Sequence, residues 1–204
     1  MKKDKFRIET DSMGDLKVPM DAKWGAQTQR ALDNFCISDL TMPSEFISAL
    51  GLIKWSAALT NEQLGLISKK KSKSIQKAAQ NLIDGDVNEE FLVDVFQTGS
   101  GTSSNMNANE VIASIASLLT DEKVHPNDDV NMSQSSNDVV PTAISVAAII
   151  RLKESLLPAL NNIISSLGHK SDSLKDVVKT GRTHLMDAMP ITLAQEVDGW
   201  KNQL

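Results

Sequence analysis

A long helical stripe constrains the fold of this chain more than any other feature. From about Val139 to Leu167, apolar residues recur every three or four positions, at Ile144, Ala148, Leu152, Leu156, Leu160, Ile163 and Leu167. This period places them on one face of a helix. The first half, Val139 to Ile150, is apolar nearly all round, so we expect it to lie inside a helical bundle. Pro158 is expected to kink the helix or to remove one backbone bond.

Shorter helical patterns precede this stripe. From about Pro43, apolar residues at helical spacing run from Phe46 to Ala57, and Pro43 itself suits a first-turn position. A second pattern runs from Ile75 to Leu82, with Gly85 as a plausible stop. These two patterns predict two helices in the first half of the chain.

Other segments give weaker signals. Asn107 and Glu110 have the spacing of a capping box ahead of the apolar run 111–119. A further helix is expected to begin near Pro190, whereas residues 1 to about 40 look irregular. No strand pattern of comparable length is present, so the predicted fold class is mainly α.

Composition narrows the class of protein. With 204 residues, 41% of them hydrophobic, the chain can bury one sizeable core or two modest ones. The net charge is -5 and the only basic block, Lys69–Lys73, is short, so we expect no nucleic-acid partner. Because Cys36 is the only cysteine, we expect no internal disulfide, no cysteine-based zinc site and a reducing compartment. Met1–Asp11 lacks an apolar leader and no apolar run approaches roughly 20 residues. We therefore expect a cytoplasmic protein without a membrane span.

Three polar segments carry the candidate chemistry. Residues 98–110, 125–138 and 181–190 each crowd small hydrogen-bonding side chains just ahead of an apolar, helix-like run. Helix N-termini and freed backbone amides attract anions. Three such segments in one helical chain suggest a shared site for a small, oxygen-rich anion.

The first two segments allow two interpretations. Ser100 and Thr102, with amides freed by Gly99 and Gly101, can wrap a carboxylate, or they can form only a turn and a cap. The run Ser135–Asn137 can likewise cap the helix that follows. Capping needs only one or two of its members, so the surplus favours contacts with a ligand.

Histidines offer proton-transfer chemistry. His184 lies in a turn expected to lead into a helix, with Thr183, Arg182 and Asp187 close in sequence, which suits a general acid or base. His125, beside Pro126, Asn127 and Asp128, can bind an anion or simply anchor its loop. With His169 as the third histidine, the spacing matches no metal motif, so no metal site is expected.

Taken together, the three segments resemble the fumarase/aspartase superfamily and, in detail, the class II fumarate hydratases. The segments Asp11–Gly14 and Trp24–Arg30 are similar to N-terminal segments of that family. Aspartases typically carry Gln, Asn and Thr at the positions of His184, His125 and Ser136. All three positions therefore favour a fumarase.

The resemblance implies reversible hydration of fumarate to (S)-malate, without a metal or an organic cofactor. It implies that His184 takes part in proton transfer. The residues implied to hold the two carboxylates of the small dicarboxylate substrate are Ser100, Gly101, Thr102, Ser135, Ser136, Asn137 and Thr183. The residues that correspond to the family's second anion site are His125, Pro126, Asn127 and Asp128.

The implied architecture is an N-terminal helical lyase domain over residues 1–135, followed at 136–204 by the first helices of a long central bundle. In the family this bundle forms a homotetramer whose active sites combine loops from three subunits. The family's mobile Gly-Ser-Ser-x-Met-Pro-x-Lys-x-Asn loop, with its serine base, and the glutamate that partners the histidine are not in this sequence. We therefore expect the chain alone to be inactive.

An apolar seam in the last residues is expected to lack an intrachain partner; it consists of Leu193, Val197, Trp200 and Leu204. Two alternatives to a fumarase stay open. One is another lyase of the superfamily, such as aspartase or argininosuccinate lyase. The other is a non-catalytic helical fragment whose seam binds a partner helix.

Overall fold

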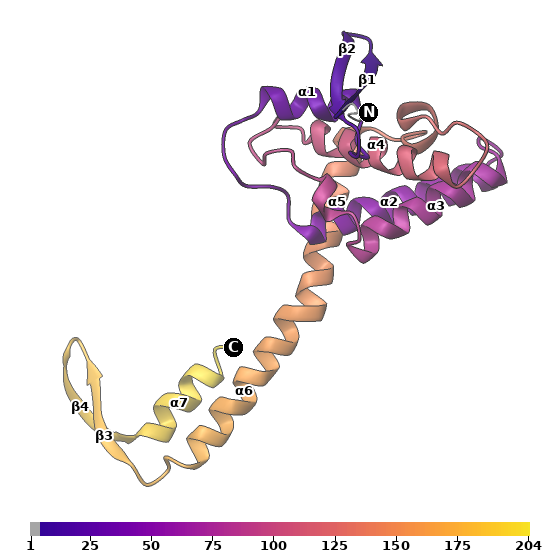
Figure 1. Cartoon of the computed structure of the whole chain (residues 1–204). Coiled ribbons are helices and arrows are strands. Elements are labelled where there is room, and N and C mark those ends of the chain that lie inside the picture. Colours follow the sequence, from indigo (N-terminus) through magenta and orange to yellow (C-terminus); the bar gives the residue numbers. More distant parts are fainter. Residues whose placement is uncertain (1–4) are drawn as a thin grey trace. The chain divides into compact units, whose positions relative to one another are not determined.

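A computed structural model describes residues 5–204, which are mostly helical, so the mainly α class is confirmed (Figure 1). The chain divides into two compact units, with the boundary between Ala148 and Ile149. Unit 1 contains, in chain order, β1 (Phe6–Asp11), β2 (Gly14–Pro19), α1 (Ala26–Asn34), α2 (Ser44–Gln63), α3 (Lys69–Asp84), the 3-10 turn η1 (Asn88–Glu90), α4 (Thr102–Leu118), the π-helical turn η2 (Pro126–Val130) and most of α5 (Ser136–Arg151). Unit 2 continues with the π-helical turn η3 (Leu152–Leu156), α6 (Leu157–Asp172), β3 (Val178–Thr183), β4 (Met186–Thr192) and α7 (Leu193–Lys201).

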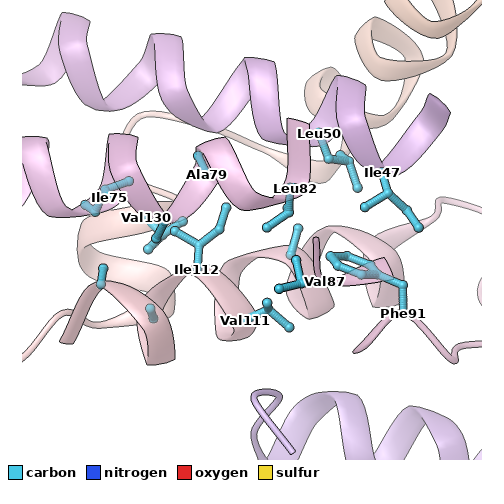
Figure 2. Close-up of a cluster of buried hydrophobic side chains, with 14 of the residues drawn as sticks. Ile47, Leu50, Ile75, Ala79, Leu82, Val87, Phe91, Val111, Ile112 and Val130 are labelled. Carbon is cyan, nitrogen blue, oxygen red and sulfur yellow. The ribbon is translucent and has the colours of Figure 1, made fainter. Parts of the chain in front are cut away.

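The core of unit 1 lies where α2, α3 and α4 meet. Leu50 of α2, Leu82 of α3 and Ile112 of α4 are fully buried. Figure 2 shows these side chains converging with their neighbours in one cluster, whose labelled members are Ile47, Leu50, Ile75, Ala79, Leu82, Val87, Phe91, Val111, Ile112 and Val130. Removal of this apolar surface from water is the main force that holds the three helices together.

The two helices predicted in the first half of the chain are confirmed as α2 and α3. The α2 helix follows Pro43 directly. The α3 helix starts after Ser68, whose Oγ accepts a hydrogen bond from the Lys71 backbone N–H at 3.1 Å. It stops at Gly85, which adopts the left-handed conformation with φ of 81°.

The capping box predicted at Asn107 and Glu110 is wrong. The α4 helix begins at Thr102, so both residues are buried in its middle. The Glu110 carboxylate instead accepts the backbone N–H groups of Gly25, Gln27 and Thr28 at 2.9, 2.9 and 3.0 Å. It therefore caps the N-terminus of α1, a role that sequence spacing cannot distinguish from a local cap.

The prediction of an irregular start is wrong where β1, β2 and α1 form, between residues 6 and 34, and is confirmed for residues 35–40, while residues 1–4 lie outside the described residues. Strands β1 and β2 form an antiparallel hairpin that turns at Ser12 and Met13, and β2 begins at Gly14, whose φ is 111°. The Arg7 guanidinium donates hydrogen bonds to the carbonyls of Pro19, Ala22 and Trp24. One long-range cation thus holds the hairpin to the segment that leads into α1, and such a contact leaves no local sequence pattern.

In unit 2, α6 and α7 pack side by side (Figure 1). The α7 helix begins at Leu193, three residues later than predicted, after a capping box between Thr192 and Gln195. The expectation for the apolar seam holds only in part. Val197 is buried, whereas Trp200 and Leu204 are exposed.

Residues 178–192 form a hairpin that we did not predict. Strands β3 and β4 pair in an antiparallel register and are joined by His184 and Leu185. Both loop residues have positive φ, 52° and 60°. Such turns usually carry Asn or Gly, so the His-Leu pair gives no turn signal. Pro190, expected near a helix start, lies in β4.

The helical stripe is confirmed as α5, η3 and α6, but its first half is not enclosed within the chain. Val139 and Ala143 are buried, whereas Ile144 and Ile149 are 57% and 56% exposed. Only one face of α5 packs on the core of unit 1, so the prediction of burial all round is wrong for this chain. The π-helical turn η3 lies just before Pro158, where the ring cannot donate a backbone bond. No helix among residues 5–204 is long and apolar enough to cross a membrane.

Candidate carboxylate-binding site

The first turns of α4 and α5 lie side by side in unit 1. Asn105 Nδ2 donates a hydrogen bond to Ser136 Oγ at 3.0 Å. A Cβ placed on Gly101 would lie 2.9 Å from Cγ1 of Val140, so the two backbones approach closely. The fold therefore brings together the first two of the polar segments identified in the sequence.

At the start of α4, Gly101 sets the direction of the chain. Its φ of 68° is left-handed, a conformation that costs little only for glycine. The turn places Ser100 Oγ 2.9 Å from Thr102 Oγ1. Ser100 is exposed and Thr102 is partly exposed, so two hydroxyls stand together at the positive end of the helix dipole.

At the start of α5, Ser135 carries the capping role. Its Oγ accepts from the Asn137 N–H at 3.3 Å, and its carbonyl accepts from Asp138 and Val139. Ser136 is held by Asn105, while the Asn137 side chain is exposed and has no hydrogen-bond partner among the described residues. Since Ser135 is enough for the cap, Ser136 and Asn137 are free to bind a ligand.

These two helix ends form a surface rich in hydrogen-bond donors. Hydroxyls, a side-chain amide and free backbone N–H groups all suit a carboxylate oxygen, and both helix dipoles favour a negative charge. The arrangement can bind a small anion.

The His125 segment forms a second feature of unit 1, built on η2. The His125 N–H donates to Asp129 at 2.7 Å, and Asp129 is bound in turn by Lys71 of α3 at 2.9 Å. Nδ1 of His125 lies 3.2 Å from the Asp128 backbone nitrogen and 3.2 Å from the Asp128 carboxylate oxygen Oδ2, so Asp128 contacts this edge of the ring.

His125, Pro126 and Asn127 line a cavity of about 430 Å³, whose other walls come from β1, the start of α1 and α4. Asp128 does not line it, and its side chain is 82% exposed. The cavity therefore presents three of the four residues of the second anion site that the resemblance implied.

Thr183 and His184 belong to unit 2. His184 is at the tip of the β3–β4 hairpin, so the turn joins two strands and the expectation that it leads into a helix is wrong. Both side chains are exposed, and within the described residues neither makes a side-chain hydrogen bond. An exposed imidazole at a hairpin tip is available for proton transfer but is not oriented by its own unit.

Comparison with known proteins places the chain in a family. Residues 14–204 match the protein family described as Lyase. The chain belongs to this lyase family. The fumarate hydratase class II of Xylella fastidiosa (strain 9a5c) is 57% identical over 201 residues, which are 98% of this lyase chain and 42% of the relative. That of Halobacterium salinarum is 50% identical over 204 residues, with 98% and 43% covered.

A solved structure agrees with these relatives. The crystal structure of class II fumarase from Schistosoma mansoni matches the lyase chain with a TM-score of 0.92 and 42% identity. The match covers 97% of the lyase chain and 43% of that structure. The lyase chain thus spans about two-fifths of the length of the relatives it matches.

A buried polar network that was not predicted from the sequence lies behind Ser136. It joins Lys54 of α2, Asn105 and Asn109 of α4, and the loop residues Asn131 and Gln134. One signal was available. Lys54 falls four residues after Leu50 and four before Ala58, which places a lysine on the buried stripe of the helix.

The lyase chain offers no preformed metal centre in the part that the structure describes. Among residues 5–204, no group of three His, Cys, Asp or Glu side chains is arranged to hold a metal ion.

Proposed function

We propose that the full-length protein containing this segment catalyses the reversible hydration of fumarate to (S)-malate. The observation that carries the proposal is the meeting of the α4 and α5 N-termini, which gathers donors for a carboxylate from two separate segments. Relatives named fumarate hydratase class II, up to 57% identical, support it. His184, His125 and Ser136 also favour a fumarase over an aspartase at the positions that distinguish the two.

In this proposal the substrate is a small dicarboxylate held by hydrogen bonds. In this proposal one set of donors lies at the start of α4, a second at the start of α5 and the third on the hairpin: Ser100, Gly101 and Thr102; Ser135, Ser136 and Asn137; and Thr183. Binding one carboxylate at two helix ends leaves the second for donors on another segment. The spacing of the carboxylates would then select dicarboxylates over single acids.

His184 has the role of proton transfer at the C2 hydroxyl of malate, directly or through a water molecule. When the proton at C3 of malate is removed, negative charge moves onto the adjacent carboxylate. Donors fixed in place before the reaction stabilise that charge in the transition state. Loss of the hydroxyl as water then needs an acid, which an imidazole supplies near neutral pH.

We also propose a larger assembly for the full-length protein. Residues 1–135 would form the N-terminal domain, and residues 136–204 would open a central bundle that assembles as a homotetramer. The exposure of Ile144 and Ile149 supports this, because such side chains favour burial against other helices.

The 204-residue chain alone would be inactive. Residues His125–Asp128 would form a second anion site, and the lone Cys36 supports a reducing compartment, the cytoplasm.

The test is an assay of the full-length protein with fumarate, in the presence and absence of ammonia. We expect malate to form without ammonia, and the Ser136→Ala variant to lose most of the activity. Ser56→Ala, which removes an exposed hydroxyl on α2, is the matched control and should keep it. If aspartate formed with ammonia and no malate formed without it, the assignment would change from fumarase to aspartase. No product in either case would favour the non-catalytic interaction fragment.

A further inference from the structure

Lys54 is a buried cation for which the proposed chemistry has no use. Its side chain is fully buried on α2, and Nζ donates hydrogen bonds to Asn131 Oδ1 at 2.9 Å and Gln134 Oε1 at 3.0 Å. Both partners are neutral. Burial lowers the pKa of Lys54 to about 7. An ammonium buried without a counter-charge is costly, so its presence calls for a reason.

Charged groups around Lys54 are engaged elsewhere. Among residues 5–204, no hydrogen bond or ion pair joins Lys54 to a carboxylate. On the elements that pack against α2, Lys71 of α3 pairs with Asp129 of η2, and Glu110 of α4 accepts backbone N–H groups of α1. An anion bound near the α5 N-terminus can therefore favour the protonated form of Lys54.

The ammonium determines the direction of a chain of hydrogen bonds. Because a protonated lysine can only donate, Asn131 must present Oδ1 to it. Asn105 then has to present Nδ2 to the same oxygen, at 3.2 Å. The same Nδ2 donates to Ser136 Oγ at 3.0 Å. Ser136 thus accepts, and its own proton is free to point away from the network.

The loop ahead of Ser135 is built around the same cation. Asn131 Nδ2 donates to the carbonyl of Gln134, and Gln134 Nε2 donates to the carbonyls of Val130 and Met132. Lys54 fixes the oxygen ends of both amides, and so it fixes which ends face the backbone. The conformation of the loop that positions residues 135–137 at the start of α5 therefore depends on Lys54.

We propose that Lys54 is a positioning residue for the carboxylate site. Through Asn131 and Asn105 it leaves the Ser136 hydroxyl proton free for a substrate carboxylate, and it adds a positive charge near the α5 N-terminus. The inference rests on the proposed function. Without the ammonium, Asn131 and Asn105 can turn over, and Asn105 Oδ1 would then accept the Ser136 proton that a substrate needs.

The test measures binding rather than turnover. Succinate, a dicarboxylate that cannot be hydrated, is titrated calorimetrically into the full-length protein and its Lys54→Met variant at about pH 6 and about pH 8.5. At the lower pH the wild-type lysine is protonated, so we expect the variant to bind about tenfold more weakly. At the higher pH the wild type has lost its charge, so the ratio of dissociation constants should shrink. Lys73→Met, which removes an exposed lysine of α3, is the matched control and should leave the ratio near one.

A second variant keeps the test valid if Lys54→Met does not fold. Asn105→Ala breaks the link to Ser136 but leaves Lys54 charged. It should weaken succinate binding severalfold and should keep only the part of the pH dependence that comes from the charge of Lys54 itself. Unchanged affinity in either variant, or a Lys54→Met ratio that is the same at both pH values, would overturn the role of Lys54.

Parallel assays of fumarate hydration separate this inference from the proposed function. If the wild type hydrates fumarate but Lys54→Met binds succinate normally, only the proposed role of Lys54 is overturned. If the wild type binds succinate through Lys54 but does not hydrate fumarate, only the fumarase assignment is overturned. If the wild type does not bind succinate, both are overturned.

Discussion

The two units support their candidate site residues in opposite ways. In unit 1, Ser136 is tied to Asn105 and through it to a buried network that ends at Lys54. In unit 2, His184 stands at a hairpin tip, exposed, with positive φ and without a side-chain hydrogen bond among the described residues. Ser136 thus lies in a segment held against a buried core, whereas His184 lies in a hairpin held by its strand pairing and by the partly exposed Lys179–Glu196 ion pair.

In the proposed function, this difference separates the residues that bind the substrate from the residue that transfers a proton. A carboxylate site gains from donors fixed in advance, because ordering them on binding costs free energy. A packed core supplies that rigidity around Ser136. The imidazole of His184 has no such support within residues 149–204, so any group that orients it has to come from outside unit 2.

The largest effect is expected when His184 is changed in the full-length protein. His184→Asn should lower kcat by about 10²- to 10⁴-fold, the usual range for losing a general acid or base. KM should change little, because a proton-transfer group acts mainly in the transition state. Steady-state kinetics of fumarate hydration would measure both.

His169→Asn is the matched control, since His169 is also an exposed histidine of unit 2, on α6. It should leave kcat unchanged, and both variants should unfold in urea within about 0.5 kcal/mol of the wild type. A large loss of stability in His184→Asn would contradict the contrast between the units, because it would show that the histidine is part of a packed structure.

The contrast also explains how far sequence patterns reach. Helices α2 and α3 were predictable because burial repeats at helical spacing and Gly85 ends α3 in the left-handed conformation. The β3–β4 hairpin was not, because His184 and Leu185 adopt positive φ without the residues that usually signal such a turn. The turn is specified by pairing along the strands, not by the loop itself.

For the candidate site, the sequence pattern indicated the polar residues at the α5 N-terminus but not the side chains that support them. Ser136 and Asn137 were recognisable because three polar residues exceed the needs of a helix cap. The roles of Lys54 and Glu110 could not be recognised in this way. Helical spacing predicts that a position is buried, but it does not predict which groups stabilise a charged side chain there. Their partners lie 77 and 85 residues away along the chain for Lys54–Asn131 and Glu110–Gly25.

The second largest effect is expected when a buried carboxylate of unit 1 is changed, and a carboxylate of unit 2 serves as the comparison. Glu110→Gln places an amide where two oxygens accept three backbone N–H groups, so one donor must face another. We expect the free energy of unfolding of the chain in urea to fall by about 2–3 kcal/mol. Glu196 of α7 pairs with Lys179 at 2.6 Å, but both side chains are about one-third exposed. Glu196→Gln should therefore cost less than about 1 kcal/mol. Equal losses would show that unit 2 depends on buried polar contacts as much as unit 1 does.

The smallest effect probes the contact between the α4 and α5 N-termini. Gly101→Ala places a β-carbon at φ of 68° and 2.9 Å from Cγ1 of Val140, so either the turn or the first turn of α5 has to move. The left-handed conformation alone costs about 1–2 kcal/mol for alanine. Urea unfolding should show a loss of that size, and succinate binding to the full-length protein should weaken severalfold as the Thr102 and Ser136 hydroxyls move apart. Gly99→Ala is the control, because a β-carbon there meets no atom within 4 Å. If both variants lost the same affinity, loop flexibility rather than the approach of the two helix ends would govern binding.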